Sequence, residues 1–432
     1  MLSARVLLTA LLLPSVSVAG GRAVPAPKNV PIGEHPADTV PMADIPVLQH
    51  LAASLPEDAD KRLVSVLDKA GPRFVTAPDP TAHFERQQAV DKGPQDGVPL
   101  RVLTYNVALL DRGYLLGLQR VQMPKVPARR SALPAQVLKD GWDVVLLQEV
   151  WDWSDVVRLA EAAEREGYVW FAGSKRKHKQ HGQMILVRGT LIEGAQVRTE
   201  GQFDDQRRIE RWPGPNIKRG YLTWTFTHSP TGQRMRVATA HPQAWASWWL
   251  VRTLQARQLG IDLGATPDDT IVVLGTDLNA GPYYPEDTFG EYEGEPVGEW
   301  WQNSLTWPVM QHYGGLHDIR VVGTDLGDVP AMHALPEWNR GWLKRPLNGD
   351  CGLVPGNVFT GTDCNSLYFS SYGGAEYPAR LDHLFLRAPD GTVGIAETGL
   401  SYVDPVDIRG ATHELSDHYG VFAELRIQPA EQ

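Results

Sequence analysis

Cysteine, long hydrophobic runs and clustered positive charge are all scarce in this sequence. Cys351 and Cys364 are the only two cysteines, and two cysteines without nearby histidines make a poor metal site. Beyond the N-terminus, no stretch stays apolar over the roughly 20 residues that a membrane-spanning helix needs. The formal net charge is −10, and no stripe of lysine and arginine is long enough to overcome the resulting repulsion of nucleic acid phosphates. These absences disfavour a transmembrane protein, a cysteine-ligated metal protein and a nucleic-acid binder.

The N-terminus is expected to direct export. Arg5 precedes the apolar run Val6–Leu13, and Ser17-Val18-Ala19 places small residues where signal peptidase reads them. We therefore predict a signal peptide over residues 1–19; the alternative is a buried N-terminal helix. The mature protein should be secreted or periplasmic, without a transmembrane helix.

The two cysteines are expected to form one local disulfide. Cys351 and Cys364 lie 13 positions apart in a stretch rich in Gly, Asn and Asp. In an exported protein such a pair is typically oxidised, and the bond would fasten one loop. The alternative is two free thiols.

Most of the chain is expected to form one large domain. Hydrophobic content of 42% and charged content of 21% are typical of a globular protein with a buried core. Prolines recur through residues 20–98, where only Ile45–Ala70 has helix-like apolar spacing, interrupted near Pro56. We predict a Pro-rich leader with a small helical segment over residues 20–98 and the main domain over residues 99–428.

The stretch Ile271–Asn279 is the centre of this domain. Four apolar residues, three of them β-branched, predict a buried strand that ends at Gly275. Asp277 and Asn279 follow two positions apart, and such residues point the same way on an extended chain. A carboxylate and an amide would then face one spot at the end of a sheet, where α/β folds hold their chemistry. The alternative is an ordinary turn.

Strands mixed with helices continue on both sides of this stretch. Strands are predicted at Leu100–Asn106, Asp143–Val150, Gln183–Arg188, Tyr221–Thr227, Met235–His241, Leu381–Leu386 and Tyr419–Ile427. Helices are predicted at Val156–Glu166 and Leu250–Leu263. This order predicts a layered α/β sandwich with long loops at one end.

Polar residues recur where the predicted strands end. They are Asn106, Glu149, His241, Asp277 with Asn279, Asp382, and Asp417 with His418. Most have an ordinary explanation alone, such as a turn cap for Asn106. Glu149 is less ordinary, because a carboxylate at the end of a buried strand needs a partner or a metal.

Together these residues resemble the motifs of the endonuclease/exonuclease/phosphatase superfamily. In chain order, the motifs are Tyr-Asn, Leu-Gln-Glu, Thr-x-His, Asp-x-Asn, Leu-Asp and Ser-Asp-His. The resemblance covers about Leu100 to Ile427 and makes residues 99–428 a catalytic domain. It implies a four-layer α/β/β/α sandwich of two packed mixed sheets flanked by helices, with the active site at one end of the sheets.

The resemblance also implies a metal centre. Glu149 would bind Mg²⁺, or Mn²⁺ or another divalent cation, as one of few carboxylates around a hard cation that keeps waters and phosphate oxygens. Asn106 and Asp417 would complete the metal environment. The implied reaction is a metal-assisted, in-line attack of water on a phosphoester.

The remaining motif residues would carry the proton transfers and hold the phosphate. His418 would be the acid/base group for the attacking water, and Asp382 would fix its tautomer. Asp277 would orient the nucleophile or assist the leaving group. His241 and Asn279 would donate hydrogen bonds to phosphoryl oxygens as charge develops there.

Several local strings resemble the Mg²⁺-dependent neutral sphingomyelinase group. They are Gln148–Asp152, Lys218-Arg219-Gly220, His241–Ala244, and Asn365-Ser366 ahead of Leu381-Asp382. By this resemblance Lys218 and Asn365 would contact substrate. The sequence departs from the usual pattern at Pro242, Thr276 and His383, where Leu, Gly and Tyr are common. The leading hypothesis is an exported phosphodiesterase that cleaves sphingomyelin to ceramide and phosphocholine.

Membrane contact would need apolar side chains beside the active site. Bacterial sphingomyelinases use a late aromatic hairpin, but Arg387–Leu415 contains only Tyr402 as an aromatic residue. Trp is amphipathic and favours bilayer interfaces. The candidates for such a rim are Trp245, Trp248, Trp249, Trp300, Trp301 and Trp307. The alternative is that these are core or lid aromatics.

Three other functions are kept as alternatives. The first is a secreted, deoxyribonuclease-like nuclease, which the acidic charge disfavours. The second is a lipid or inositol phosphatase on the same scaffold. The third is a catalytically idle surface-binding protein, which the retained cluster of carboxylates disfavours because it costs stability. We expect a monomer.

Overall fold

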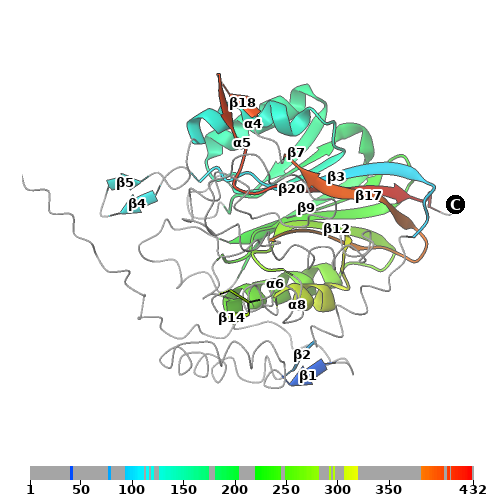
Figure 1. Cartoon of the computed structure of the whole chain (residues 1–432). Helices are drawn as coiled ribbons and strands as arrows, with labels where there is room; N and C mark the ends of the chain where they lie inside the picture. The colour runs from blue at the N-terminus through cyan, green and yellow to red at the C-terminus, as the bar shows by residue number, and fades with distance from the viewer. Residues whose placement is uncertain are drawn as a thin grey trace, which may run out of the picture.

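Two six-stranded mixed sheets pack face to face, and helices cover both outer faces (Figure 1). Sheet I has the strand order β15 (His317–Asp318), β16 (Asp382–Arg387), β12 (Thr270–Asp277), β11 (Arg234–Ala240), β10 (Gly220–His228) and β9 (Ile192–Gln202). Sheet II has the order β17 (Val393–Ser401), β20 (Gly420–Ile427), β3 (Val98–Asn106), β6 (Val144–Gln148), β8 (Met184–Arg188) and β7 (Tyr168–Ala172). Sheet II is covered by α4 (Val126–Leu138) and α5 (Trp153–Arg165), and sheet I by α6 (Trp249–Gly264) and α8 (Thr306–Gly314). The four-layer α/β/β/α sandwich is confirmed.

The computed structural model describes residues 39–41, 76–78, 93–110, 113–115, 118–120, 126–174, 181–203, 219–244, 249–281, 291–292, 295–296, 306–319, 381–402, 406–408 and 410–430. Smaller elements within these ranges are the 3₁₀ helix η3 (Gly189–Leu191) and four two-stranded sheets. These sheets pair β1 (Thr39–Pro41) with β2 (Thr76–Pro78), β4 (Gly113–Leu115) with β5 (Leu118–Arg120), β13 (Glu291–Tyr292) with β14 (Glu295–Pro296), and β18 (Val406–Ile408) with β19 (Ala411–His413).

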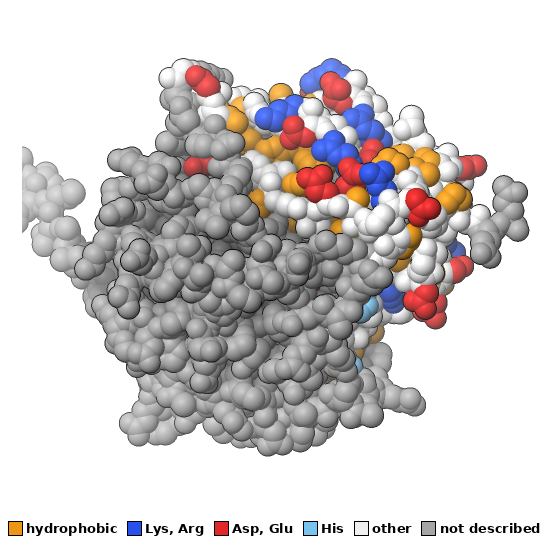
Figure 2. Space-filling view, turned by 45° about the vertical axis from the view of Figure 1, so that its right-hand side comes forward, with side chains coloured by type: hydrophobic (Ala, Val, Ile, Leu, Met, Phe, Trp, Pro, Cys, Tyr) orange, Lys and Arg blue, Asp and Glu red, His pale blue; other side chains and the backbone are white. Residues whose placement is uncertain are grey.

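Several predictions fall outside the described residues. They concern the signal peptide 1–19, most of the leader 20–98, Lys218, Asn365, Cys351, Cys364, Trp245, Trp248, Trp300, Trp301 and the side chain of Trp249. Within the described ranges no helix is long and apolar enough to cross a membrane. On the described part of the face in Figure 2, acidic and basic side chains are interspersed rather than gathered into a stripe of one sign.

The central strand β12 is apolar on both faces because each face meets a different layer. Ile271 and Val273 pack in the core between the two sheets. Val272 and Leu274 point the opposite way, toward α6 and α8. Alternation with period two therefore sorts one continuous apolar run between two cores. The strand continues to Asp277, so the predicted end at Gly275 is wrong by two residues.

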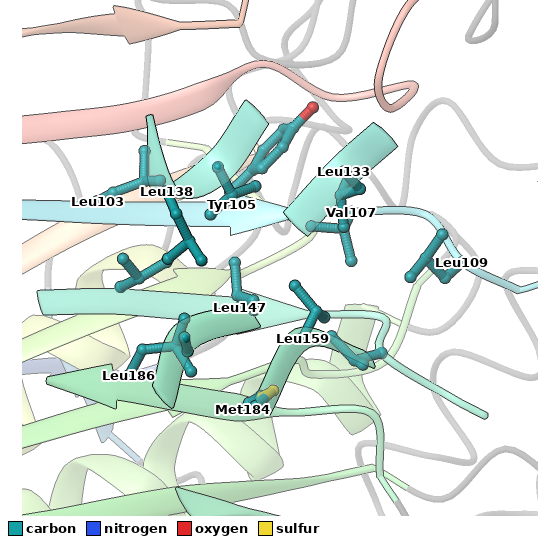
Figure 3. Close-up of a cluster of buried hydrophobic side chains, with 14 of the residues drawn as sticks. Leu103, Tyr105, Val107, Leu109, Leu133, Leu138, Leu147, Leu159, Met184 and Leu186 are labelled. Atoms are coloured by element: carbon teal, nitrogen blue, oxygen red, sulfur yellow. The ribbon is translucent and has the colours of Figure 1, made fainter. Parts of the chain in front are cut away.

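The strands of sheet II also divide their side chains between two cores, one facing sheet I and one facing the helices. Leu103 and Tyr105 of β3 and Leu147 of β6 alternate with residues that face sheet I. They pack against Leu133 of α4 and Leu159 of α5, as Figure 3 shows. This layer places α4 directly against the ends of β3 and β6, where the polar motif residues begin.

The other strands and helices predicted for residues 99–428 are present, with ends shifted by a few residues. The elements without a prediction are those whose sequence pattern is weak. Pro134 lies inside α4, and an internal proline is typical of a helix end rather than a helix. Strand β9 lies at the edge of sheet I with most of its side chains exposed, so it lacks the apolar alternation that signals a strand.

His228, the last residue of β10, should make stability depend on pH. It is fully buried, its Nδ1 lies 2.7 Å from the Thr231 hydroxyl, and burial lowers its pKa to about 4. The unfolded chain takes up the proton near pH 6.5 and the folded chain does not. This stabilisation is therefore complete above pH 6.5 and is lost as the pH falls through 4.

We expect the free energy of unfolding to fall by on the order of 3 kcal/mol between pH 7 and pH 4 from this residue alone. His228→Gln keeps a polar side chain but takes up no proton, so its stability should fall less over the same range. Urea unfolding of both proteins at several pH values measures the difference. Equal pH slopes would contradict the assignment.

Candidate active site

Strand register brings the motif residues of both sheets to one end of the sandwich. Asp277 and Asp382 are direct partners in the antiparallel ladder of β12 and β16. Asn106 and Gln148 are partners in the parallel ladder of β3 and β6. The Asn106 side-chain amide donates to Asp277 Oδ2 at 2.8 Å and so joins the two sheets. The candidate site therefore straddles the paired sheets.

His418 and Asp382 form a buried hydrogen-bonded pair. The distance from His418 Nδ1 to Asp382 Oδ2 is 2.6 Å, and because a carboxylate only accepts, Nδ1 carries a proton. Nε2 lies on the other side of the ring, 3.9 Å from Asp277 Oδ2. Burial lowers the pKa of His418, but nearby carboxylates, Asp382 first among them, raise it well above its usual value. This is the arrangement of a general acid/base with its tautomer fixed.

Asp277 connects the other groups of the site. Its side-chain ligand atoms form a compact group with those of Asp382 and His418, all within 4.8 Å of one another. Burial and then the charge of Asp382 raise the pKa of Asp277 to about 7. Burial thus makes the charged form of Asp277 costly, and the neighbouring charge of Asp382 adds to that cost.

Glu149 occupies the end of β6 in a strained conformation. Its φ of +61° is unusual for a residue with a side chain. The Leu109 amide donates to its carbonyl at 3.2 Å. Its side chain is 17% exposed, and Oε1 lies 3.8 Å from His241 Nε2. Burial and the charge of Asp417 raise the pKa of Glu149, so this carboxylate faces a second acidic group.

His241 lies between the carboxylates of Glu149 and Asp277. Its Nε2 is 3.3 Å from Asp277 Oδ2 as well as near Glu149. Burial, then the charges of Arg219 and His418, lower the pKa of His241 well below its usual value. A neutral imidazole can donate one hydrogen bond without adding charge, as the predicted role requires.

Asn279 lies just past the end of β12. Its φ is +52°, so the extended geometry that would align it with Asp277 ends at the strand terminus. Its backbone amide donates to Asp277 Oδ1 at 3.0 Å, and its side-chain amide donates to the Pro242 carbonyl at 3.3 Å. Asn279 therefore ties the loop after β12 to the loop after β11, and donation to phosphate stays a proposal.

Asp417 is buried in the segment before β20. The neighbouring Ser416 hydroxyl donates to the Asn106 carbonyl at 2.6 Å and accepts from the His418 amide at 3.2 Å. These bonds place Asp417 and His418 against the end of β3. The structure thus brings together Asn106, Glu149, His241, Asp277, Asp382, Asp417 and His418.

Arg219 is a buried cation of the site that the sequence analysis passed over in favour of Lys218. It directly precedes β10, and its side chain is nearly buried. Its guanidinium lies 5.8 Å from the centre of the Trp151 ring, which in turn lies 6.1 Å from the His241 ring. The Arg219 charge lowers the pKa values of both Glu149 and His241. The sequence signal that could have indicated a buried Arg219 is its position directly before Gly220, at the start of a strand predicted to be buried.

Two further buried groups were missed because they look structural. The Gln148 amide donates to Thr104 at 3.0 Å and to Thr239 at 2.9 Å, which bridges the sheets directly beneath Glu149. Arg252 of α6 donates to the Gln243 carbonyl at 3.1 Å and holds the loop that follows His241. No sequence pattern marks such contacts.

The prediction that Trp307 could line a membrane-touching rim is wrong. Trp307 is fully buried in α8, and its indole donates to Asp318 Oδ2 at 2.9 Å. The same oxygen lies 2.7 Å from Nδ1 of His383, whose Nε2 lies 2.8 Å from the Ala280 carbonyl. His383, at a position where Tyr is common, supports the loop after Asp277 from below.

The donor set fits a hard divalent cation. Glu149 and Asp417 supply carboxylate oxygens, which suit Mg²⁺ and Mn²⁺. Burial first, and then the charges of Asp417 and Asp382, raise the pKa values of Glu149 and Asp277, so a bound cation would stabilise their ionised forms. The amide oxygen of Asn106 also accepts from the Ala108 amide at 3.0 Å, so Asn106 is the least available of the predicted ligands.

Solved structures with a similar fold include three from animals. Zebrafish (D. rerio) TDP2 complexed with single strand DNA product is 19% identical, with 76% of this chain and 98% of that chain covered and a TM-score of 0.48. Truncated Caenorhabditis elegans TDP2 is 16% identical, with 77% and 100% covered and a TM-score of 0.46. The human nocturnin catalytic domain with bound sulfate anion is 14% identical, with 76% and 95% covered and a TM-score of 0.45.

Comparison with curated protein sequences found no match. The pattern of the Endonuclease/Exonuclease/phosphatase family matches residues 103–418. This match runs from β3 to His418 and includes every motif residue gathered at the site, without selecting the sphingomyelinase group. Because it spans more than half of the chain, the protein belongs to the Endonuclease/Exonuclease/phosphatase family.

Proposed function

We propose that this protein is an exported, Mg²⁺-dependent phosphodiesterase of the sphingomyelinase type, which hydrolyses sphingomyelin to ceramide and phosphocholine. The observation that carries the hydrolytic part is the His418–Asp382 pair beside Asp277 at the end of the sheets. The choice of sphingomyelin is supported by the local strings around Glu149, His241 and Asn365.

His418 and Asp382 would manage the protons. Asp382 holds the Nδ1 proton, so Nε2 is the nitrogen that exchanges a proton with the reacting oxygen. The water oxygen bonds to phosphorus as the bond to the ceramide oxygen breaks. His418 Nε2 would take the proton that leaves the water, and the Asp277 carboxyl, 3.9 Å from Nε2, would deliver one to the departing oxygen.

Glu149 and Asp417, with Asn106, would hold the cation, which when bound polarises the phosphate and neutralises its charge. His241 would donate to a phosphoryl oxygen. Arg219 would supply a fixed positive charge on the same side, held in place against Trp151. Lys218 and Asn365 remain proposed substrate contacts.

One panel of substrates tests the proposal. The purified protein is incubated with sphingomyelin, phosphatidylcholine, DNA and inositol phosphates, each with Mg²⁺ and with EDTA. We expect Mg²⁺-dependent release of phosphocholine from sphingomyelin above all other products. Cleavage of DNA alone would establish a nuclease instead, release of inorganic phosphate would establish a phosphatase, and no turnover would favour a binding protein.

Membrane contact is expected from the tryptophans that remain candidates. Trp248 and Trp249 precede or begin α6, directly after the His241 loop, and Trp300 and Trp301 follow the Asp277 loop in sequence. Replacing either pair with Ala should lower activity on sphingomyelin vesicles far more than on a soluble phosphodiester analogue, because the reacting groups stay intact. Equal loss on both substrates would mean core tryptophans, and no loss would place the rim elsewhere.

A further inference from the structure

Arg129 of α4 is fully buried and donates to three backbone carbonyls. One guanidinium nitrogen donates to Val107 at 3.1 Å and to Leu415 at 2.8 Å. The other donates to Ala108 at 2.6 Å. These carbonyls belong to two loops, one after β3 and one before β20, that are far apart in sequence: the bonded residues Asn106 and Ser416 of these loops lie 310 positions apart.

The two loops carry or contact every proposed metal ligand. Val107 and Ala108 directly follow Asn106, and Leu415 precedes Asp417 by two positions. The Val107 and Leu109 amides donate to the carbonyls of Gln148 and Glu149 at 3.1 and 3.2 Å. The Arg129 guanidinium therefore bonds directly to the segments that contain Asn106 and Asp417. It is linked to the segment of Glu149 through one further backbone hydrogen bond.

The geometry around Arg129 is costly and needs support. Ala108 and Glu149 both have positive φ, +48° and +61°. Such backbone persists only where surrounding contacts enforce it. Burial lowers the pKa of Arg129, while the charges of Asp417 and Glu149 act in the opposite direction, so the cation lies beneath the acidic groups. An arginine stays charged in such a place, and its planar fork can span two loops where a lysine ammonium cannot.

We propose that Arg129 is a positioning residue for the metal centre. It fixes the loop after β3 and the segment before β20 at the spacing at which Asn106, Glu149 and Asp417 can share one divalent cation. This inference rests on the metal ligands of the proposed function. It assigns to Arg129 no contact with substrate.

The test compares Arg129→Lys with Arg130→Lys, a matched change at the next residue of the same helix. Arg130 pairs instead with Asp152 and Asp155, at 3.1 and 2.5 Å, on the α5 side. Mg²⁺ affinity is measured without substrate, from the rise in melting temperature with Mg²⁺ concentration. Kinetic constants on sphingomyelin are measured alongside.

Arg129→Lys should weaken Mg²⁺ binding about 10- to 100-fold and lower kcat with little change in KM, the usual range for a residue that orients metal ligands. Arg130→Lys should bind Mg²⁺ like the wild type even if its melting temperature falls. Wild-type Mg²⁺ affinity in Arg129→Lys would overturn the proposal and leave Arg129 as a core residue.

A second variant decides the matter if Arg129→Lys does not fold. Ser416→Ala removes the 2.6 Å bond between the same two segments without a large cavity. Weaker Mg²⁺ binding would support the positioning role, and unchanged binding would overturn it. If the wild-type protein binds Mg²⁺ but cleaves no substrate of the panel, the proposed function is contradicted and the proposal for Arg129 is not.

Discussion

Glu149→Gln is expected to abolish nearly all hydrolysis and leave the fold intact. The substitution removes the charge of the proposed metal ligand and keeps its shape, so no cavity forms. The loss should exceed the 10- to 100-fold that is typical of changes around, rather than at, a metal ligand. Activity is measured over a series of Mg²⁺ concentrations up to saturation.

The same variant should not lose stability. Burial and repulsion from Asp417 raise the pKa of Glu149, so the charge is unfavourable in the metal-free fold. The melting temperature of Glu149→Gln in EDTA should therefore equal or exceed that of the wild type. Glu166→Gln, a matched change at an exposed glutamate on the same sheet's helix layer, should alter neither property. Wild-type rates at saturating Mg²⁺ would remove Glu149 from the metal site.

The existence of the central strands was predictable because local pattern determines it, but their exact ends were not: β12 continues to Asp277 rather than ending at Gly275. Apolar runs precede two of the motif carboxylates, Val144–Leu147 before Glu149 and Ile271–Leu274 before Asp277. Short runs of this kind, rich in β-branched residues and bounded by turn residues, are consistent with buried strands. The resemblance of the motifs then supplied the relative placement, including the packing of two sheets.

Geometry past the strand ends was not predictable in this way. Asn279 was expected to continue the extended geometry of Asp277, but its φ is positive and its side-chain amide donates to the Pro242 carbonyl. Trp307 was counted with the loop tryptophans, but it lies in α8, where it is buried in the core and donates to Asp318. Both outcomes depend on how a loop closes against a distant element, which a local pattern does not contain.

The buried cations were hidden for a different reason. Arg129 and Arg219 are residue types that are rarely buried, so a sequence argument assigns them to the surface. Arg129 also lies in α4, whose internal Pro134 obscures the helix. Only long-range contacts, such as that between Arg129 and Leu415, reveal that these residues support the site.

The His418–Asp382 pair should behave as one unit when it is dissected. His418→Asn removes the proton carrier and should lower kcat about 10²- to 10⁴-fold, the usual contribution of acid/base catalysis. Asp382→Asn offers an amide where Nδ1 needs an acceptor, so the imidazole would adopt the wrong tautomer and lose a similar factor. Because both changes disable one proton transfer, the double variant should be no slower than His418→Asn alone.

The molecule contains a matched control for this experiment. His383 and Asp318 form a buried pair of nearly the same geometry, 2.7 Å against 2.6 Å, and β16 contributes one residue to each pair, His383 and Asp382. His383 instead bonds the Ala280 carbonyl through its other nitrogen, so it has no nitrogen left for a reacting oxygen. Asp318→Asn should therefore lower the melting temperature but keep kcat within about tenfold of the wild type. Two results would show that the His418 pair supports the fold rather than the reaction. One is a loss of kcat in the His418/Asp382 double variant that equals the product of the two single losses. The other is a loss of kcat in Asp318→Asn as large as that in Asp382→Asn.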